Sequence, residues 1–162
     1  MILGIDPGLR GGYTFLGEEF AGFSAHEWRT VKEFYNRVFS IQNTYLIPQG
    51  IKITAVLEKI TALPAKSTKT EAVFFQNIGA IKAVLEILNI PIIEVRPQTW
   101  QTIRGKWQLK NIDNKAKSIA AAQEIWPGYE FPHGARGKIY DGPVEAALIA
   151  YWYHKKGKLY AN

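Results

Sequence analysis

Acidic residues occupy four positions of this chain at which a carboxylate needs an explanation. Asp6 and Glu58 each end a run of apolar residues that is typical of a strand buried on both faces. Asp141 and Glu145 are four residues apart, so their side chains share one face if this segment is a helix. A lone carboxylate at the centre of a sheet is strongly unfavourable unless it is paired or binds a metal.

These four carboxylates predict chemistry with divalent cations. Acids at the ends of two neighbouring strands converge, and a helix packed across the sheet brings the other two to the same point. Such a cluster raises its own pKa values unless cations compensate its charge. Oxygen ligands suit Mg²⁺, with Mn²⁺ as a substitute, and two ions about 4 Å apart can drive phosphodiester hydrolysis. We expect Asp6, Glu58, Asp141 and Glu145 to be the metal ligands and catalytic residues of such an enzyme.

The composition limits which binding partner and which cellular compartment we expect for this protein. The 162 residues are 47% hydrophobic, enough for one substantial core, and we expect a single domain over residues 1–162. Lys and Arg number 20 against 14 Asp and Glu, a net charge of +6 that favours an anionic partner such as nucleic acid. The chain has no cysteine, which excludes zinc thiolates and thiol catalysis. With no signal peptide and no long apolar run, we expect a protein of the phage or bacterial cytosol that does not contact membranes.

Hydrophobic periodicity predicts the elements that position the acids. Apolar runs separated by turn residues indicate strands, and apolar residues at helical spacing indicate helices. We expect an α/β fold with a mixed five-stranded sheet flanked by helices. The predicted strands cover 2–5, 13–16, 20–23, 51–57 and 91–95, and the predicted helices cover 30–45, 70–89, 97–103, 112–126 and 141–155. Thr30 is the expected N-cap of the first helix, Asp141 suits the cap of the last, and residues 128–140 form a loop that we expect to be mobile without substrate.

The predicted helix 70–89 is apolar on two sides. Phe74, Ile81 and Leu85 belong to one stripe, and Phe75 and Ile87 belong to another. One side is expected to face the core and the other a second subunit, although a central core helix would show the same pattern.

Basic residues flank the proposed site in chain order, and contact with phosphates is their expected role. The candidates for DNA binding are Lys66, Lys69, Arg104, Lys106, Lys110, Lys115, Lys117, Arg136 and Lys138. Aromatic residues in the same segments, such as Trp107 and Tyr129, could stack on unpaired bases, with core packing as the alternative.

Three segments resemble the RuvC-type Holliday junction resolvases, above all their compact phage-like members: GIDPG at 4–8, VLEK at 56–59 and DGPVEAALIAYW at 141–152. The segment 76–101 resembles the family's long helix and the strand that follows it. The resemblance implies the RNase H-like fold and the roles of Asp6, Glu58 and Glu145. Many cellular members place their third acid three residues before the last, whereas that position is Gly142 here and Asp141 lies four before.

The resemblance also implies an activity and an assembly. Its members are Mg²⁺-dependent endodeoxyribonucleases that act as homodimers on four-way junctions, and we expect paired nicks that leave 5′-phosphates. Alternatives remain open at this point. The chain could be a broader nuclease for forks and flaps, or a junction-binding module without catalysis. A GIDPG turn also opens the phosphate loop of actin-like ATPases, but those proteins need two lobes and this length supplies one.

Overall fold

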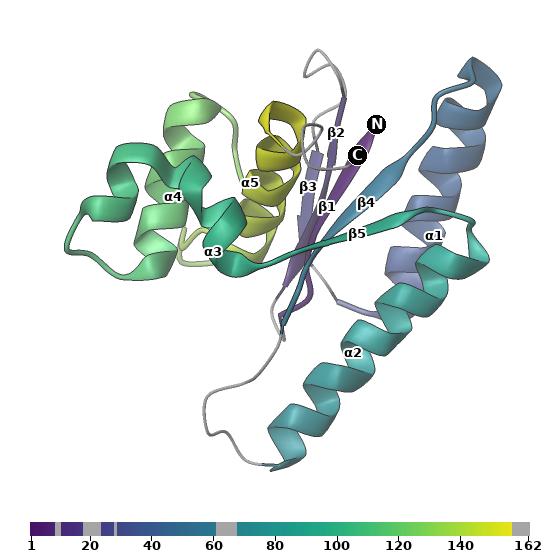
Figure 1. The fold of residues 1–162 in the computed structure, drawn as a ribbon, viewed down its shortest axis with the longest axis horizontal. Coiled ribbons are helices and arrows are strands. Elements are labelled where there is room, and N and C mark those ends of the chain that lie inside the picture. The colour runs from purple at the N-terminus through teal and green to yellow at the C-terminus, as the bar shows by residue number, and fades with distance from the viewer. Residues whose placement is uncertain (9–10, 18–23, 28, 61–67, 157–162) are drawn as a thin grey trace.

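The computed structural model describes residues 1–8, 11–17, 24–27, 29–60 and 68–156, with 68–70 described by their backbone. Its centre is a five-stranded sheet of order β3-β2-β1-β4-β5, in which β1 pairs antiparallel with β2 and parallel with β4 (Figure 1). The predicted mixed five-stranded sheet is confirmed. The strands are β1 (Ile2–Asp6), β2 (Gly12–Leu16), β3 (Ser24–Glu27), β4 (Thr54–Glu58) and β5 (Ile92–Val95).

Helices cover both faces of this sheet and bury two separate apolar clusters (Figure 1). Leu3, Ile5 and Leu57 pack toward α1 and α2, while Val56 packs toward the face covered by α5. Successive side chains of a strand therefore point into opposite clusters, one on each face of the sheet. The helices are α1 (Val31–Ile41), α2 (Thr68–Ile87), α3 (Pro97–Trp100), the 3-10 helix η3 (Gln101–Leu109), α4 (Asn114–Ile125) and α5 (Asp141–Lys155).

The first helix begins as predicted, and a π-helical turn and a 3-10 turn follow its last α-helical residue. The Oγ1 of Thr30 accepts a hydrogen bond from the Glu33 amide at 3.1 Å, which confirms the N-cap. A π-helical turn η1 (Gln42–Leu46) and a 3-10 turn η2 (Ile47–Gln49) follow, and Gly50 ends them with a φ of 66°. The helical stretch therefore reaches the predicted stop at Gly50.

Three predicted element bounds differ from those that the structure describes. The strand expected at 20–23 lies outside the described residues, and the third strand of the structure is Ser24–Glu27. This strand is mostly polar because it lies at the sheet edge, so it lacks the apolar pattern of a buried strand. The strand expected from Ile51 begins at Thr54, and the one-residue extension to Glu58 keeps that acid within the sheet. The cap of α5 is Tyr140, so Asp141 lies in the first turn and the prediction that it caps the helix was wrong.

Helix α5 lies directly on β1 and β2 because two glycines leave room for its backbone. A Cβ on Gly4 would stand 2.1 Å from the carbonyl oxygen of Ala146, and one on Gly12 would stand 2.3 Å from the nitrogen of Pro143. A side chain at either position would push the helix off the sheet. This contact brings the first turns of α5 over the end of β1.

Candidate active site

Asp6 and Glu58 lie at the same end of two neighbouring parallel strands. Ile5 pairs with Leu57 in the register of β1 and β4, and the two acids are the next residue of each strand. Parallel strands end at one edge of a sheet, so the predicted adjacency of the two acids is confirmed. The Asp6 Oδ1 accepts a hydrogen bond from the Gly8 amide at 3.0 Å, which orients the carboxylate in the turn after β1.

Helix α5 adds Asp141 and Glu145 to this pair. Burial raises the pKa of Asp6 well above 3.8, and the charges of Glu145, Glu58 and Asp141 raise it further. Three of the four residues thus act electrostatically on the fourth. We call Asp6, Glu58, Asp141 and Glu145 the acid cluster.

Burial raises the pKa of three carboxylates of the acid cluster, those of Asp6, Glu58 and Glu145. Burial, followed by the charge of Glu145, raises the pKa of Glu58 to about 7. Burial also raises the pKa of Glu145, although the Ser118 hydroxyl and the Arg104 guanidinium oppose that shift. If all of these carboxylates were ionised together they would repel one another, and a bound cation would relieve that repulsion.

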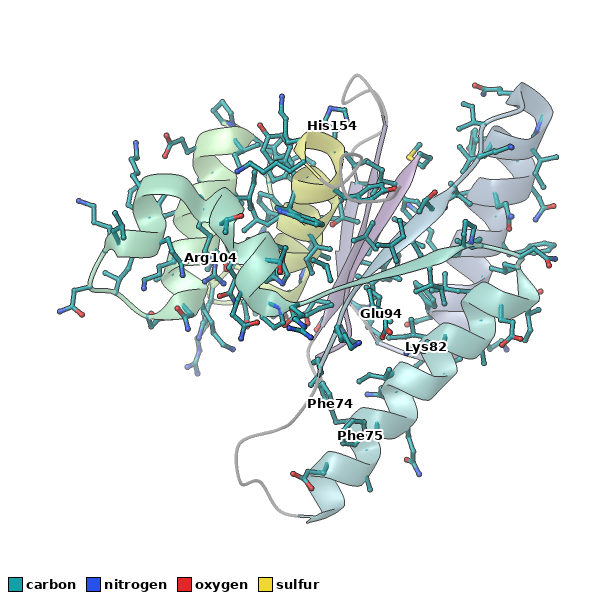
Figure 2. All side chains as sticks on the ribbon, in the orientation of Figure 1. Phe74, Phe75, Lys82, Glu94, Arg104 and His154 are labelled. Atoms are coloured by element: carbon teal, nitrogen blue, oxygen red, sulfur yellow. The ribbon has the colours of Figure 1, made fainter. Side chains whose placement is uncertain are left out.

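Two basic side chains supply part of that positive charge from within the fold. The Nη2 of Arg104 lies 3.2 Å from the Oε1 of Glu145, and its guanidinium lies over the ring of Trp100 at 5.0 Å (Arg104 is labelled in Figure 2). The Ser118 hydroxyl donates to the same Glu145 oxygen at 2.8 Å. From α4, the Nζ of Lys115 lies 2.6 Å from the Oδ2 of Asp141.

Across the described part of the chain, no three acidic, cysteine or histidine side chains lie close enough together to hold a metal ion. Glu145 and Asp141 each direct an oxygen at a cation of the protein. The donor set itself fits Mg²⁺ or Mn²⁺, because it consists of carboxylate oxygens. The assignment of the four acids as metal ligands and catalytic residues stays a prediction.

The structure divides the predicted DNA-binding residues into groups. Arg104 was expected to contact phosphate at the protein surface. Its side chain is instead buried against Trp100 and Glu145, so that prediction was wrong. Lys115 is exposed but pairs with Asp141, at the edge of the acid cluster. Lys66 lies outside the described residues, and Lys69 is described by its backbone alone. The others are exposed or half-buried: Lys106, Lys110, Lys117, Arg136 and Lys138.

Sequence reasoning missed one polar partner and misread the role of another residue. Ser118 was not singled out, although it follows Lys115 by three residues and therefore shares its face of α4. No local pattern distinguishes Arg104 from the exposed lysines near it.

Two aromatic candidates for base stacking hydrogen-bond within the protein. The Tyr129 hydroxyl accepts from the Ala25 amide at 3.0 Å, and the Trp107 indole donates to Glu124 at 2.6 Å.

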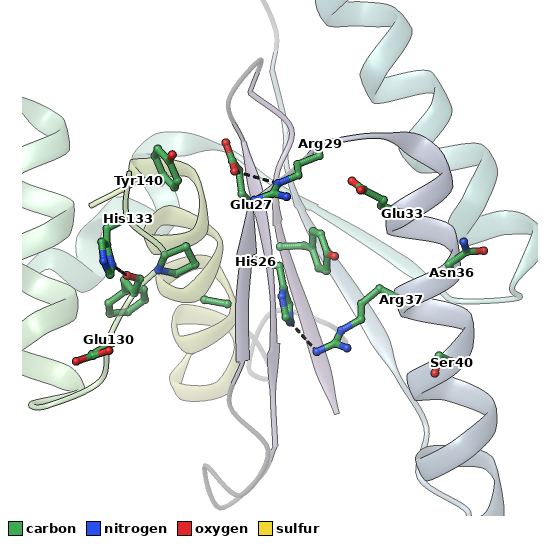
Figure 3. A pocket seen from close by; sticks show the side chains of 14 residues that line it. His26, Glu27, Arg29, Glu33, Asn36, Arg37, Ser40, Glu130, His133 and Tyr140 are labelled. Atoms are coloured by element: carbon green, nitrogen blue, oxygen red, sulfur yellow. Dashed lines mark hydrogen bonds and ion pairs between the residues drawn. The ribbon is translucent and has the colours of Figure 1, made fainter. Parts of the chain in front are cut away.

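A separate cleft of about 870 Å³ lies beside the edge strand β3, between α1 and the segment 130–140 (Figure 3). It holds one ion pair and one contact between an arginine and a histidine. Glu27 pairs with Arg29 at 3.3 Å, and Arg37 lies 3.4 Å from the Nε2 of His26. Burial, together with the charge of Arg37, lowers the pKa of that histidine to about 4. The cleft lacks the group of mutually repelling carboxylates that marks the acid cluster.

Comparison with known proteins gives a result for the fold alone. No protein-family model and no curated protein sequence matches the chain. A structure of T. thermophilus RuvC in complex with a Holliday junction substrate matches with a TM-score of 0.63 and 13% identity, covering 96% of this chain and 95% of that one. A Thermus thermophilus RuvC structure matches with a TM-score of 0.50 and 15% identity, covering 96% of each chain. The protein therefore has the RuvC-like variant of the RNase H-like fold.

Proposed function

We propose that this protein is a divalent-metal-dependent endodeoxyribonuclease that cleaves Holliday junctions and related branched DNA. The observation that carries the proposal is the acid cluster, in which β1, β4 and α5 of a RuvC-like fold bring four mutually repelling carboxylates together. A structural scaffold has no use for such repulsion. A phosphodiester hydrolase that binds cations has a use for it.

The acid cluster would hold Mg²⁺ or Mn²⁺, and two bound ions would activate a water molecule and stabilise the leaving 3′ oxygen of a phosphodiester. The chain's own residues prepare that site. Gly8 orients Asp6 through its amide, and Ser118 and Arg104 fix the position of Glu145. Lys115 holds Asp141 at the rim, where its charge also favours the approach of a phosphate. The products would be paired nicks with 5′-phosphates.

The substrate class follows from charge. The net charge of +6 favours a polyanion, and the exposed lysines of η3 and α4 lie in the elements that supply Arg104 and Lys115 to the acid cluster. We assign phosphate contacts to Lys106, Lys110, Lys117, Arg136 and Lys138 on the described surface, and to Lys66 and Lys69 in the segment after β4.

A homodimer is the proposed assembly, with α2 at its interface. One side of this helix packs in the core through Ile81 and Leu85, whereas Val73, Phe75 and Ile87 are exposed. Exposed apolar side chains along one helix are typical of an interface between subunits. Two copies of the acid cluster would then act on two strands of one junction.

No helix in the described ranges is long and apolar enough to cross a membrane.

The test is cleavage of a labelled immobile four-way junction beside linear duplex and a splayed fork, in Mg²⁺ or EDTA. Wild type is compared with Asp6→Asn and with Glu33→Gln, a control at an exposed glutamate of α1. Symmetric nicks in the junction, lost in EDTA and in Asp6→Asn but kept in the control, support a resolvase. Equal cutting of junction and fork identifies a broader debranching nuclease. Binding without cutting in Mg²⁺ or Mn²⁺ contradicts the catalytic proposal.

A further inference from the structure

Two buried hydrogen-bond donors lie beside the acid cluster, and neither has an acceptor at hydrogen-bonding geometry in the described part of the chain. They are the Nε1 of Trp100 and the Nε of Arg104, and both side chains are fully buried. A buried N–H without an acceptor is unfavourable, because it has lost its hydrogen bonds to water and gained none. Native proteins leave few such groups, so two of them at one site need a physical reason.

The fold places the Trp100 indole next to Glu58. In the register of β4 and β5, Glu58 pairs with Val95, and α3 begins two residues later at Pro97 and ends at Trp100. Glu58 is two residues after Val56, so both side chains point to the same face of the sheet. Val56 belongs to the same apolar cluster as Trp100. Strand register and a one-turn helix therefore bring the indole to the Glu58 carboxylate.

Both donor side chains already act on this carboxylate. Burial and the charge of Glu145 raise the pKa of Glu58, whereas the Trp100 N–H and the charge of Arg104 lower it. The guanidinium also lies over the Trp100 ring at 5.0 Å, so the two side chains are packed together. Glu58 is thus the nearby acceptor that a small rotation would bring to both donors.

The other nitrogens of Arg104 are occupied and hold it in place. Its Nη1 donates to the Oε1 of Gln108 at 3.3 Å, and its Nη2 donates to the Oε1 of Glu145 at 3.2 Å. The Nε is the donor that remains. Because Trp100 and Arg104 are fully buried, the close packing around them limits how far they can move toward an acceptor. Glu58 is partly exposed, so its carboxylate has more freedom to move toward them.

A carboxylate that binds a metal ion through one oxygen keeps the other oxygen for the protein. Such ligands are oriented by hydrogen bonds from residues that do not touch the metal, and loss of one of these bonds weakens metal binding. A hydrogen bond to an ionised carboxylate is also stronger than one to a neutral group. The two donors are therefore suited to the metal-bound state of the acid cluster.

We propose that Trp100 and Arg104 are positioning residues that hold one oxygen of Glu58, through the Nε1 and the Nε, when a divalent cation takes the other. This inference rests on the proposed function and deepens it, because it names the residues that set how tightly the acid cluster holds its metal. Arg104 then orients two acids of the cluster at once, since it also pairs with Glu145.

The test compares wild type with Trp100→Phe, which keeps an aromatic ring under Arg104 and removes the N–H. Trp126→Phe is the matched control, because it makes the same change in the same apolar cluster, where Trp126 packs on Phe131 and Tyr151. Mn²⁺ affinity is measured without DNA by electron paramagnetic resonance of the free ion. The near-ultraviolet difference spectrum between Mg²⁺ and EDTA reports on the indole. Thermal melting in EDTA checks the fold of each variant.

We expect Trp100→Phe to bind Mn²⁺ about tenfold more weakly than wild type, the lower end of the loss seen when a hydrogen bond to a metal ligand is removed. The indole band of the difference spectrum should disappear in the same variant. Trp126→Phe should keep both the affinity and the band. In a Glu58→Gln background, Trp100→Phe should cause little further loss of affinity, because the acceptor on which it acts has been changed.

Other outcomes overturn the proposal in different ways. If wild type cuts the junction with Mg²⁺ and Trp100→Phe binds Mn²⁺ equally well, the positioning role is wrong and the proposed function stands. Equal losses in Trp100→Phe and Trp126→Phe, or an undiminished loss in the Glu58→Gln background, show a general packing effect and also overturn it. A wild-type spectrum without an indole band contradicts it without any variant. A wild-type protein that binds no Mn²⁺ overturns the positioning role and the metal-dependent function together.

Discussion

The Nη2 of Arg104 lies 3.2 Å from the Oε1 of Glu145, and the guanidinium that makes this contact is buried. Burial and the charge of Glu145 raise the pKa of Glu58, and the same cation opposes that rise. A positive charge of the protein therefore stands inside the acid cluster and offsets part of the repulsion among its carboxylates. Burial lowers the pKa of Arg104 in turn, whereas the nearby acids raise it.

Loss of Arg104 should destabilise the protein strongly. Arg104→Met leaves Glu145 and Glu58 without their buried counter-charge, and breaking a buried pair from one side costs about 3 to 5 kcal/mol. Urea unfolding at pH 7.5 in EDTA measures the change in the free energy of unfolding. The control is Lys106→Met, which removes an exposed, solvent-screened pair with Glu124 and should cost much less. Similar losses in the two variants would show that Arg104 does not compensate the cluster.

Metal binding should stabilise the folded protein. An ion that binds the folded acid cluster alone adds about 2.7 kcal/mol at 100 times its Kd, which corresponds to roughly 5 to 10 °C in Tm for a chain of this size. Differential scanning fluorimetry with Mg²⁺ against EDTA measures the increment. Asp6→Asn should remove most of it, and Glu86→Gln should keep it. An unchanged increment in Asp6→Asn places the ion elsewhere.

The stability of the metal-free protein should fall with rising pH because of Glu58. Its pKa in the folded protein is about 7, above the ordinary value of 4.5 that it has in the unfolded chain. Its contribution to stability is therefore complete below pH 4.5 and is lost as the pH rises through 7. At pH 8, Glu58→Gln should be more stable than wild type by about 2 to 3 kcal/mol, and at pH 4.5 the two should be nearly equal.

Urea unfolding at both pH values in EDTA measures this difference. Glu86→Gln removes an exposed carboxylate and should change the stability by less than about 0.5 kcal/mol at either pH. A gain for Glu58→Gln that is as large at pH 4.5 as at pH 8 would mean that charge repulsion is not its cause.

Gly4→Ala should displace α5. The added Cβ meets the Ala146 carbonyl at 2.1 Å, so the helix that supplies Glu145 must move away from β1, at a cost of about 1 to 3 kcal/mol. Junction cleavage should fall together with stability. In Gly79→Ala the added Cβ meets nothing within 4 Å, and a helical alanine should add about 0.5 to 1 kcal/mol. The pair is compared by urea unfolding and by the cleavage assay, and full activity in Gly4→Ala would argue against a strict geometry at the cluster.

Phe75→Glu should convert the proposed dimer into a monomer. A charge on the exposed apolar side of α2 cannot be buried against a second copy without a large desolvation penalty. Sedimentation velocity at micromolar concentration measures the state of assembly. Ile47→Glu changes an exposed isoleucine outside α2 and should leave the dimer intact. A wild-type monomer at these concentrations contradicts the dimer directly.

The sequence by itself determined the kind of elements and the acids that end them. Apolar runs that stop at Asp6 and Glu58 are local patterns, and so is the four-residue spacing of Asp141 and Glu145 on a helix. Strand, turn and helix signals depend on neighbours within a few residues, so they can be read from a chain without knowing its fold. The order of strands and helices followed from the same signals, which did not predict the polar edge strand Ser24–Glu27 and misplaced some helix ends.

Tertiary structure alone decided which charges are buried together. The partners of Glu145 are 41 and 27 residues away in the chain, in Arg104 and Ser118, and no local pattern separates Arg104 from the exposed lysines that follow it. The desolvation of a charge depends on every element packed around it, so neither the raised pKa of Glu58 nor the burial of Arg104 can be derived from spacing. The need for glycine at position 4 is likewise decided by tertiary structure. It follows from the close approach of the α5 backbone, which the sequence does not reveal.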